Sequence, residues 1–215
     1  MIEKKIQFQK CKKMAEEIDK IFPLEEHIFE VFTQIQRESF VPVGFKHYAY
    51  KLDALPLSSS QWISSPLTVA KMTQFLEIND KVDSVMEIGC GSGYQAAILS
   101  KLIRRVFTIE RIEKLSIEAK IRFKKMEINN IHIRCDDGQN GWSSYAPFDR
   151  ILFSASIKEI PKKIFNQLKN GGILVAPIEK DKKHIITKFI KKDDKIIKNE
   201  LDNCLFVPIL NGVKK

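Results

Sequence analysis

The sequence predicts an α/β fold with a doubly wound, mostly parallel sheet. Short apolar runs recur along its 215 residues and alternate with stretches of helical periodicity. The first clear run, Val85–Ile88, ends in a glycine turn at residues 89–93, and helical spacing resumes at Tyr94. A second run, Val106–Ile109, ends at Glu110. Alternating strands and helices build parallel sheets, in which ligands bind at the carboxyl ends of the strands.

The glycine turn and Glu110 together predict a site for a nucleoside-containing cofactor. Glycine lets the backbone approach a ligand, and a carboxylate about twenty residues downstream can accept hydrogen bonds from both ribose hydroxyls. The turn has the spacing G-x-G-x-G, not the G-x-G-x-x-G of dinucleotide sites, and Glu87 precedes it. A carboxylate in the crevice would repel a pyrophosphate, so the pattern favours the cationic sulfonium of S-adenosylmethionine. A glycine turn without a ligand is the alternative.

A third strand is expected at Ile131–Arg134, followed by Asp137 and Gly138. A carboxylate at this strand tip could accept the exocyclic amine of adenine, while backbone amides satisfy the ring nitrogens. Asp-Gly is also an ordinary turn signal, so the two interpretations carry equal weight for Asp137 alone.

The remaining patterns place further elements around this core. Two amphipathic helices are expected in the first forty residues, broken at Pro23, as a helical cap on one side of the sheet. Their expected apolar positions are Phe8, Cys11, Met14, Ile18 and Ile21, then Ile28, Val31, Phe32 and Ile35. Pro66 is expected to start a helix that reaches Leu76. Later elements are a strand at 150–154, a helix at 160–168 that ends near Gly171, a strand at 173–177, and antiparallel edge strands at 185–190 and 205–208.

The serine-rich stretch 53–66 is expected to be a loop, because its composition lacks periodicity. It carries Trp62 flanked by hydroxyl side chains, which is unusual for a simple connection. Loops with aromatic and hydrogen-bonding side chains beside a cofactor crevice commonly hold substrates.

Length, composition and charge limit the kinds of protein that this chain can be. The length suits a single domain, with helices and the substrate loop in 1–66, the cofactor core in 67–180 and an antiparallel edge in 181–215. The four cysteines form no C-x-x-C pair and the four histidines no ligand set, so no metal site is expected. The amino end is charged from the outset, which favours the cytoplasm over secretion. A net charge of +9 permits a nucleic-acid partner, but the lysines are spread along the chain as on solvated helix faces.

More specific motifs show that the chain resembles the protein-L-isoaspartate O-methyltransferases. The likeness runs from about Arg37 to Val207 through the segments 37–42, 54–56, 61–66, 87–95, 109–111, 137–138, 141–142, 146–149, 160–161, 171–172 and 206–208. The G-S-G-Y-Q continuation and the I-S-x-P loop are its most specific parts. The resemblance implies a Rossmann-like seven-stranded sheet and methyl transfer from S-adenosylmethionine to isoaspartyl carboxylates of damaged proteins. We expect no nucleic-acid or membrane partner and a monomeric state.

Residue roles also follow from this resemblance. Ser64 is implied to be the active-site serine, within a substrate-binding set of Gln61, Trp62, Ile63 and Ser64. The implied cofactor-binding residues are Glu87, Ile88, Gly89, Gly91, Gly93, Glu110, Arg111, Asp137 and Gly138. The chain departs from the family at Ser58–Ser60, where glycines are usual, at Trp62, where threonine is usual, and at Asp136, where glycine is usual.

The implied reaction requires little chemical activation of the acceptor by the protein. A carboxylate with a pKa of about 4 is ionised at neutral pH, so it needs no strong general base, and alignment supplies most of the catalysis. Ser64 would hold the substrate carboxylate by a hydrogen bond; the alternative is that it caps the helix that begins at Pro66.

Two rival functions find less support in the sequence. A nucleic-acid amino-methyltransferase would carry a D/N-P-P-Y/F tetrad where this chain has residues 154–157, and cytosine C5 chemistry would need a cysteine nucleophile in a strand-tip motif. A non-enzymatic chain that only binds a protein partner would be favoured by loss of Gly89, Gly91 or Glu110, and all three are present.

Overall fold

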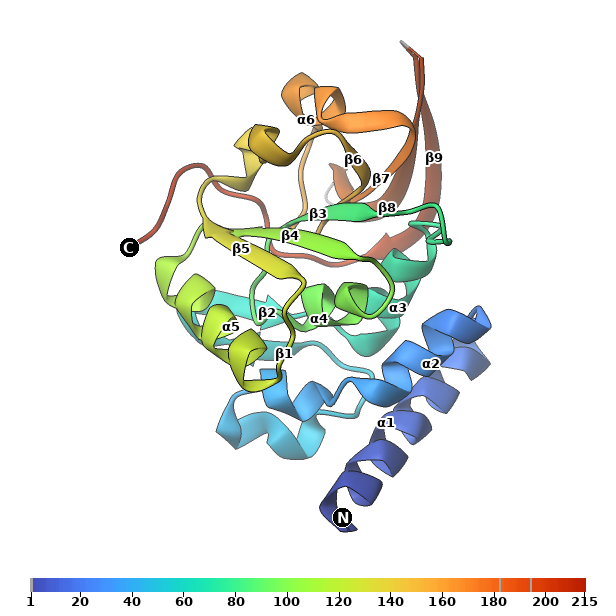
Figure 1. Cartoon of the computed structure of the whole chain (residues 1–215), viewed down its shortest axis with the longest axis vertical. Helices are drawn as coiled ribbons and strands as arrows, with labels where there is room; N and C mark the ends of the chain where they lie inside the picture. Colours follow the sequence, from blue (N-terminus) through green and yellow to red (C-terminus); the bar gives the residue numbers. More distant parts are fainter. Residues whose placement is uncertain (1, 182, 194) are drawn as a thin grey trace.

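A seven-stranded sheet organises the part of the chain that the structure describes, residues 2–181, 183–193 and 195–215 of a computed structural model (Figure 1). The strand order is β5-β4-β3-β6-β7-β8-β9. The first five strands in this order are parallel, and β8 and β9 are antiparallel. The bounds are β3 Ser84–Ile88, β4 Arg105–Glu110, β5 Ile131–Cys135, β6 Phe148–Phe153, β7 Leu168–Lys180, β8 Lys183–Lys192 and β9 Lys195–Cys204. The predicted doubly wound, mostly parallel sheet with an antiparallel edge is confirmed.

Helices cover both faces of this sheet. On one face lie α3 (Pro66–Gln74), α4 (Tyr94–Ser100) and α5 (Glu113–Lys125), and on the other lies the short α6 (Lys162–Asn166) (Figure 1). Successive residues of each central strand enter different cores: Val85 packs in the core under α3–α5, and Met86 in the core under α6. This burial on both faces explains why the strands read as continuous apolar runs.

The chain reverses its direction of travel across the sheet at β3. From β3 it proceeds through β4 to β5 on one side, then crosses to β6 and β7 on the other. Crevices for ligands form at such switch points, outside the carboxyl ends of the strands. The glycine turn at 89–93 lies at this point.

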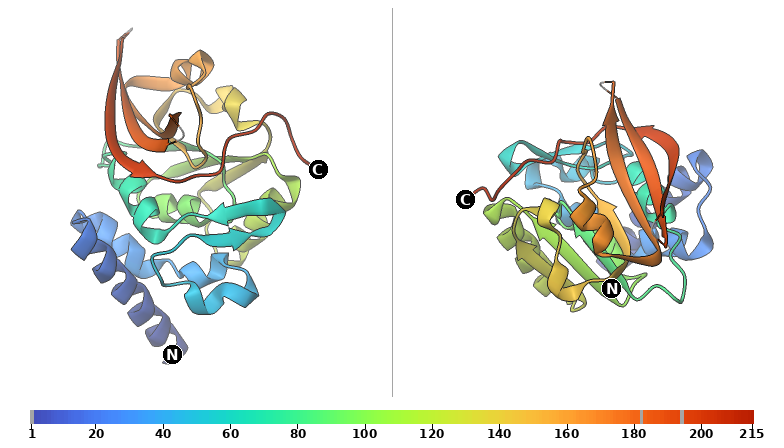
Figure 2. Two further views of the ribbon diagram at one scale, coloured as in Figure 1. Left: turned by 180° about the vertical axis from the view of Figure 1, so that it is seen from behind. Right: turned by 90° about the horizontal axis from the view of Figure 1, so that it is seen from above.

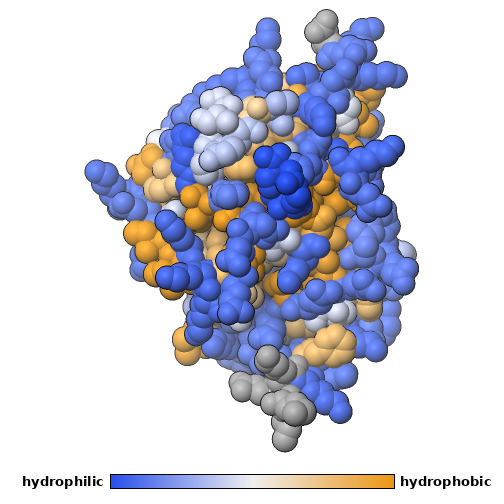
Figure 3. Space-filling model, viewed as in Figure 1, coloured by the Kyte–Doolittle hydropathy of each residue, from blue (hydrophilic) through white to orange (hydrophobic). Residues whose placement is uncertain are grey.

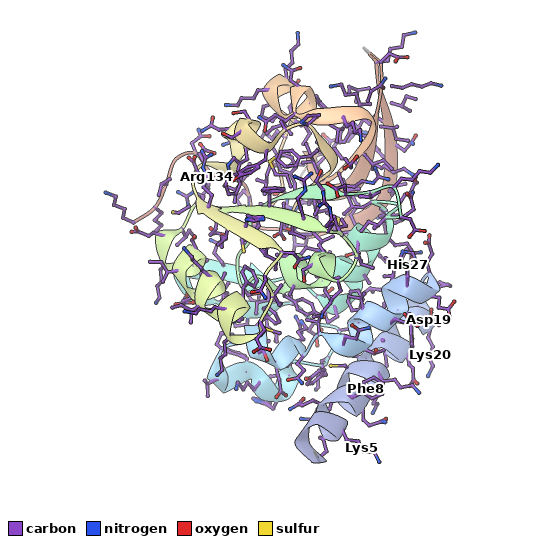
Figure 4. The ribbon with its side chains drawn as sticks, viewed as in Figure 1. Lys5, Phe8, Asp19, Lys20, His27 and Arg134 are labelled. Carbon is purple, nitrogen blue, oxygen red and sulfur yellow. The ribbon has the colours of Figure 1, made fainter. Side chains whose placement is uncertain are left out.

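The amino-terminal helices α1 (Ile2–Ile21) and α2 (Glu26–Gln34) form where the apolar periodicity predicts them. They pack on each other and on α3, not directly on the sheet (Figure 1). The expected apolar face of α1 is shorter than predicted, because Phe8 is 46% exposed and Ile21 is 60% exposed. Figure 4 labels Phe8 on α1.

The stretch expected to be a loop at 53–66 contains a small antiparallel hairpin, β1 (Leu55–Leu57) and β2 (Gln61–Ile63), which we call the hairpin. Serine composition predicts a loop, but Ile63 is buried opposite Leu55, and this pairing sets the local structure. The turn places Ser59 and Ser60 at positive φ, 61° and 58°. These are the left-handed positions where glycine is favoured.

Three further expectations were wrong in detail. Strand β7 begins at Leu168, not at residue 173, because Leu168 pairs with Phe148, so Gly171 lies within the strand and does not end a helix. The last edge strand is β9, not residues 205–208. Since β9 is exposed along most of its length, it has no apolar alternation by which the sequence could reveal it.

Residues 205–215 form a C-terminal segment that returns across the molecule. In Figure 2 (left) it runs between the sheet and the hairpin.

Figure 3 shows hydrophilic side chains spread over the face seen in Figure 1, with smaller apolar patches between them. Among the described residues, no helix combines the length and the apolar character that crossing a membrane requires.

We predict that Gly93→Ala destabilises the protein by about 2 to 5 kcal/mol, from left-handed strain of about 1–2 and overpacking of about 1–3. Gly93 has a φ of 87°, and an added Cβ would lie 2.6 Å from the Phe123 ring. Urea unfolding measures the change. Gly44→Ala is the control, because no atom lies within 4 Å of its Cβ position and its φ is ordinary; equal losses in both variants would contradict the prediction.

Candidate active site

A cleft of about 970 Å³, its open mouth included, lies at the carboxyl ends of β3, β4 and β6. The turn after β3 forms its floor, the hairpin forms one wall, and residues 206–210 of the C-terminal segment form another. The cleft therefore joins three parts of the chain that are far apart in the sequence.

Most of the site residues predicted from the sequence meet in this cleft. They are Gln61, Trp62, Ile63, Ser64, Glu87, Ile88, Gly89, Gly91, Glu110, Arg111 and Gly138. Gly93 and Asp137 do not line it. Gly93 faces Phe123 of α5, and a side chain there would collide with the ring, so glycine leaves room for α5 beside the start of α4. Its expected contact with the cofactor stays a prediction.

The glycine turn is bonded to the end of β4. The backbone amides of Gly89 and Cys90 both donate to the Ile109 carbonyl, at 2.9 and 3.2 Å. Gly91 has a φ of 54°, and a Cβ there would meet only Leu57, at 3.9 Å. The backbone at Gly91 is therefore open toward the cleft, as close approach of a ligand requires.

Glu110 completes this turn from β4. Its Oε2 accepts a hydrogen bond from the Gly91 amide at 2.7 Å, and its Oε1 accepts one from the Ile112 amide at 2.9 Å. Burial raises the pKa of Glu110 above its ordinary value, while these two bonds oppose that shift. Each oxygen keeps a further lone pair, so the carboxylate can still accept two ribose hydroxyls.

Glu87 lies at the bottom of the cleft and is 0% exposed. Thr108 Oγ1 donates to its Oε2 at 2.6 Å, and Ser154 Oγ donates to its Oε1 at 3.0 Å. Burial raises the pKa of Glu87 to about 8, despite these two bonds. The sequence predicts a fixed negative charge at Glu87, whereas a pKa of about 8 favours the protonated carboxyl at neutral pH when no cation is bound.

Ser64 stands at the junction of the hairpin and α3, half-buried against the cleft. The helix cap is its neighbour: Ser65 Oγ accepts a hydrogen bond from the Thr68 amide at 3.1 Å. The alternative role considered for Ser64, capping of α3, is therefore filled by Ser65.

Asp137 is bonded to the protein itself. Its Oδ1 accepts from the Gln139 amide and its Oδ2 from the Gly212 amide, each at 2.9 Å. Its side chain thereby ties the tip of β5 to the C-terminal segment. Its expected contact with adenine stays a prediction.

The C-terminal segment contributes wall residues that the sequence argument did not assign to the site. Ile209 donates its amide to the Ser156 carbonyl, and Lys214 donates its amide to the Arg111 carbonyl. The segment is thus attached on both sides of the β3 tip. The sequence carries a signal for it, since Phe206-Val207-Pro208 is part of the family motif, but the apolar run at 205–208 also predicts an edge strand.

These features fit S-adenosylmethionine. The open backbone at Gly91 and the free lone pairs of Glu110 suit the adenosine half, and the acidic floor suits a sulfonium. Within the described residues, no group of three or more His, Cys, Asp or Glu side chains could hold a metal ion.

Comparisons with known proteins agree with this geometry. Residues 9–214 match the family described as protein-L-isoaspartate(D-aspartate) O-methyltransferase. A protein-L-isoaspartate O-methyltransferase of Helicobacter pylori (strain J99 / ATCC 700824) is 55% identical over 202 residues, which cover 94% of this chain and 96% of that protein. One of Maricaulis maris (strain MCS10) is 46% identical over 82% of each chain.

Solved structures share the architecture. A protein-L-isoaspartate O-methyltransferase superposes with a TM-score of 0.84 at 26% identity, over 94% of this chain and 66% of that chain. A Plasmodium falciparum structure titled as a putative protein-L-isoaspartate O-methyltransferase in complex with S-adenosyl-L-homocysteine superposes with a TM-score of 0.82 at 20% identity, over 93% of this chain and 98% of that one. The second likeness bears on the fold alone. On the family match and on these identities, the chain belongs to the protein-L-isoaspartate(D-aspartate) O-methyltransferase family.

Proposed function

We propose that this protein transfers the methyl group of S-adenosylmethionine to the free carboxylate of L-isoaspartyl residues in damaged proteins and peptides. The observation that carries this is the meeting, in one cleft, of the glycine turn and Glu110 with the hairpin that bears Ser64. The products are a methyl ester and S-adenosylhomocysteine. Repair is thus assigned to this chain on its family and on its own cleft.

Bound S-adenosylmethionine supplies an electrophilic methyl group. The chain's part is to hold and orient: the turn at 89–91 and Glu110 would bind the ribose side, with Ile88, Arg111 and Gly138 beside it. Gly93 would act through packing, and Asp137 through the C-terminal segment.

The acceptor carboxylate needs orientation more than activation. It is ionised at neutral pH, and no histidine or lysine lines the cleft within the described residues. The Ser64 hydroxyl would donate a hydrogen bond to one carboxylate oxygen, which leaves the other oxygen to attack in line. Alignment of this kind can supply roughly 7–11 kcal/mol of the barrier.

The peptide around the isoaspartyl residue would contact the hairpin. Trp62 is 55% exposed at the rim of the cleft, with Gln61 and Ile63 beside it. An exposed indole there offers a large apolar surface to a flexible peptide. The cytoplasmic location and the monomeric state expected from the sequence remain predictions.

The direct test uses labelled S-adenosylmethionine with a matched pair of peptides, one with isoaspartate and one with ordinary aspartate at the same position. We expect a base-labile methyl ester on the isoaspartyl peptide alone. Equal labelling of both peptides would contradict a repair function, and labelling of neither would contradict the proposed substrate.

Ser64→Ala is expected to lower kcat/KM for the isoaspartyl peptide by roughly 10- to 150-fold, the effect of losing a hydrogen bond to a charged group worth about 1.5–3 kcal/mol. Affinity for S-adenosylhomocysteine should stay within about threefold of wild type. The matched control is Ser65→Ala, which removes the helix cap. Ser65→Ala should lower the free energy of unfolding by about 0.5–2 kcal/mol and leave turnover nearly unchanged. Weak cofactor binding in Ser64→Ala would contradict the assigned role.

The raised pKa of Glu87 predicts that the preference for S-adenosylmethionine over S-adenosylhomocysteine depends on pH. Below its pKa of about 8 the free protein holds Glu87 protonated, and a nearby sulfonium favours the carboxylate, so binding releases a proton. The ratio of affinities for S-adenosylmethionine and S-adenosylhomocysteine should therefore rise from pH 6.5 to 8, by at most about tenfold per pH unit, and level off above pH 8.

Isothermal titration with both ligands measures this ratio. Taking the ratio cancels the titration of the amino acid moiety that the two ligands share. In Glu87→Gln the ratio should not change with pH. A ratio that rises equally in wild type and in Glu87→Gln would show that another group is responsible.

A further inference from the structure

We infer that Arg37 is a positioning residue for the reaction, because it closes the base of the hairpin and sets the place of Ser64 over the cleft. This inference rests on the role proposed for Ser64. Arg37 lies in a short 3₁₀ helix at Arg37–Phe40, outside the cleft, so it would act through the backbone and not on the substrate.

The environment of Arg37 is unusual for a charged side chain. It is 0% exposed, and within the described residues it forms no ion pair with a carboxylate. A buried charge without a counter-ion costs several kcal/mol unless its hydrogen bonds are well satisfied. Its guanidinium instead donates to three backbone carbonyls.

Those three carbonyls are the reason for the inference. Nη1 donates to the Ala49 carbonyl at 2.8 Å, and Nη2 donates to the carbonyls of both Asp53 and Ser64, each at 3.0 Å. Asp53 precedes the hairpin and Ser64 follows it. A single nitrogen therefore joins the two ends of the hairpin.

The hairpin needs such a clamp. Each of its strands has three residues, and it pairs with no other strand of the described chain. An isolated two-stranded hairpin is marginally stable in water. Its turn also carries Ser59 and Ser60 in the left-handed region, which adds strain. Burial of Leu55 and Ile63 in the core holds the middle of the hairpin, and the bonds of Arg37 hold its base.

Arg37 also connects the hairpin to the cofactor side of the cleft. Its guanidinium carbon lies 5.8 Å from the centre of the Tyr94 ring. Tyr94 is the first residue of α4, directly after the glycine turn, and it is 1% exposed. The same side chain thus contacts the segment that bears Ser64 and the helix that starts at the turn. This fixes their separation, on which in-line transfer depends.

Lysine could not replace this arrangement. A guanidinium presents a rigid planar fork of donors, while an ammonium is a point charge on a flexible stem. Arg37→Lys would keep the charge and lose part of the clamp.

The protein contains a matched control. Arg150 is also buried, at 7% exposed, and also donates to three backbone carbonyls, those of Leu76, Glu77 and Asp149. It lies near the start of β6, at the end of the sheet opposite the cleft. A purely structural role for Arg37 predicts that Arg37→Lys and Arg150→Lys behave alike.

The experiment compares Arg37→Lys with Arg150→Lys below the melting temperature of both. We expect both to lose thermal stability. Only Arg37→Lys should lose kcat/KM for the isoaspartyl peptide, by roughly ten- to a hundredfold, mostly in kcat, with affinity for S-adenosylhomocysteine within about threefold of wild type. Equal kinetic losses in the two variants would overturn the inference. If either lysine variant fails to fold, the neutral pair Arg37→Gln and Arg150→Gln replaces it and is judged by the same outcomes.

A double variant identifies the route of the effect. In a Ser64→Ala background, Arg37→Lys should cause little further loss, because the hydroxyl that it positions is gone. A further loss as large as in wild type would show that Arg37 acts elsewhere.

Hydrogen exchange provides a readout that does not depend on the substrate. The amides of residues 55–64, other than Pro56, should exchange at least tenfold faster in Arg37→Lys, and their exchange should be unchanged in Arg150→Lys. If wild type fails to methylate the isoaspartyl peptide, the proposed function fails, while this measurement still decides whether Arg37 clamps the hairpin; unchanged exchange in both variants would refute it.

Discussion

The attachment of the turn after β3 to the end of β4 is the constraint on which the rest of the site depends. Two amides of this turn converge on the Ile109 carbonyl, and a third bonds to the Glu110 side chain. At β3 the chain changes its direction across the sheet. At such switch points the connections on the two sides diverge and leave a crevice in front of the turn. The cleft is the space that this arrangement leaves open.

Around that turn, the cleft is assembled from parts with little stability of their own. The hairpin has only three residues in each strand, and the C-terminal segment has no regular structure along most of its length. Each is held by contacts at its ends: the hairpin by Arg37, and the C-terminal segment by Ser156, Arg111 and Asp137.

Two buried carboxyl groups give the cleft its electrostatic character. Glu87 and Glu110 are raised in pKa by burial, and each is held by two hydrogen bonds. A cation that enters beside Glu87 stabilises its ionised form, so the negative charge develops where and when the cation binds. The cleft thereby favours a positively charged ligand.

The sequence by itself determined the central strands, the glycine turn, Glu110 and the class of cofactor, because each depends on local patterns: apolar runs, glycine spacing, and an acidic residue at a strand end. Its family motifs also pointed to Ser64. Only the tertiary structure decided that Asp137 bonds to the C-terminal segment, that Gly93 packs against Phe123, and that residues 206–210 wall the cleft. It also decided that the Arg37 side chain donates hydrogen bonds to the carbonyls of Ala49, Asp53 and Ser64, which lie 12, 16 and 27 residues further along the chain. Asp137 and Arg37 bond to backbone atoms of remote segments, which every residue carries alike, so the order of side chains does not reveal these bonds. The packing of Gly93 on Phe123 depends on how closely α4 and α5 approach, which the sequence does not state.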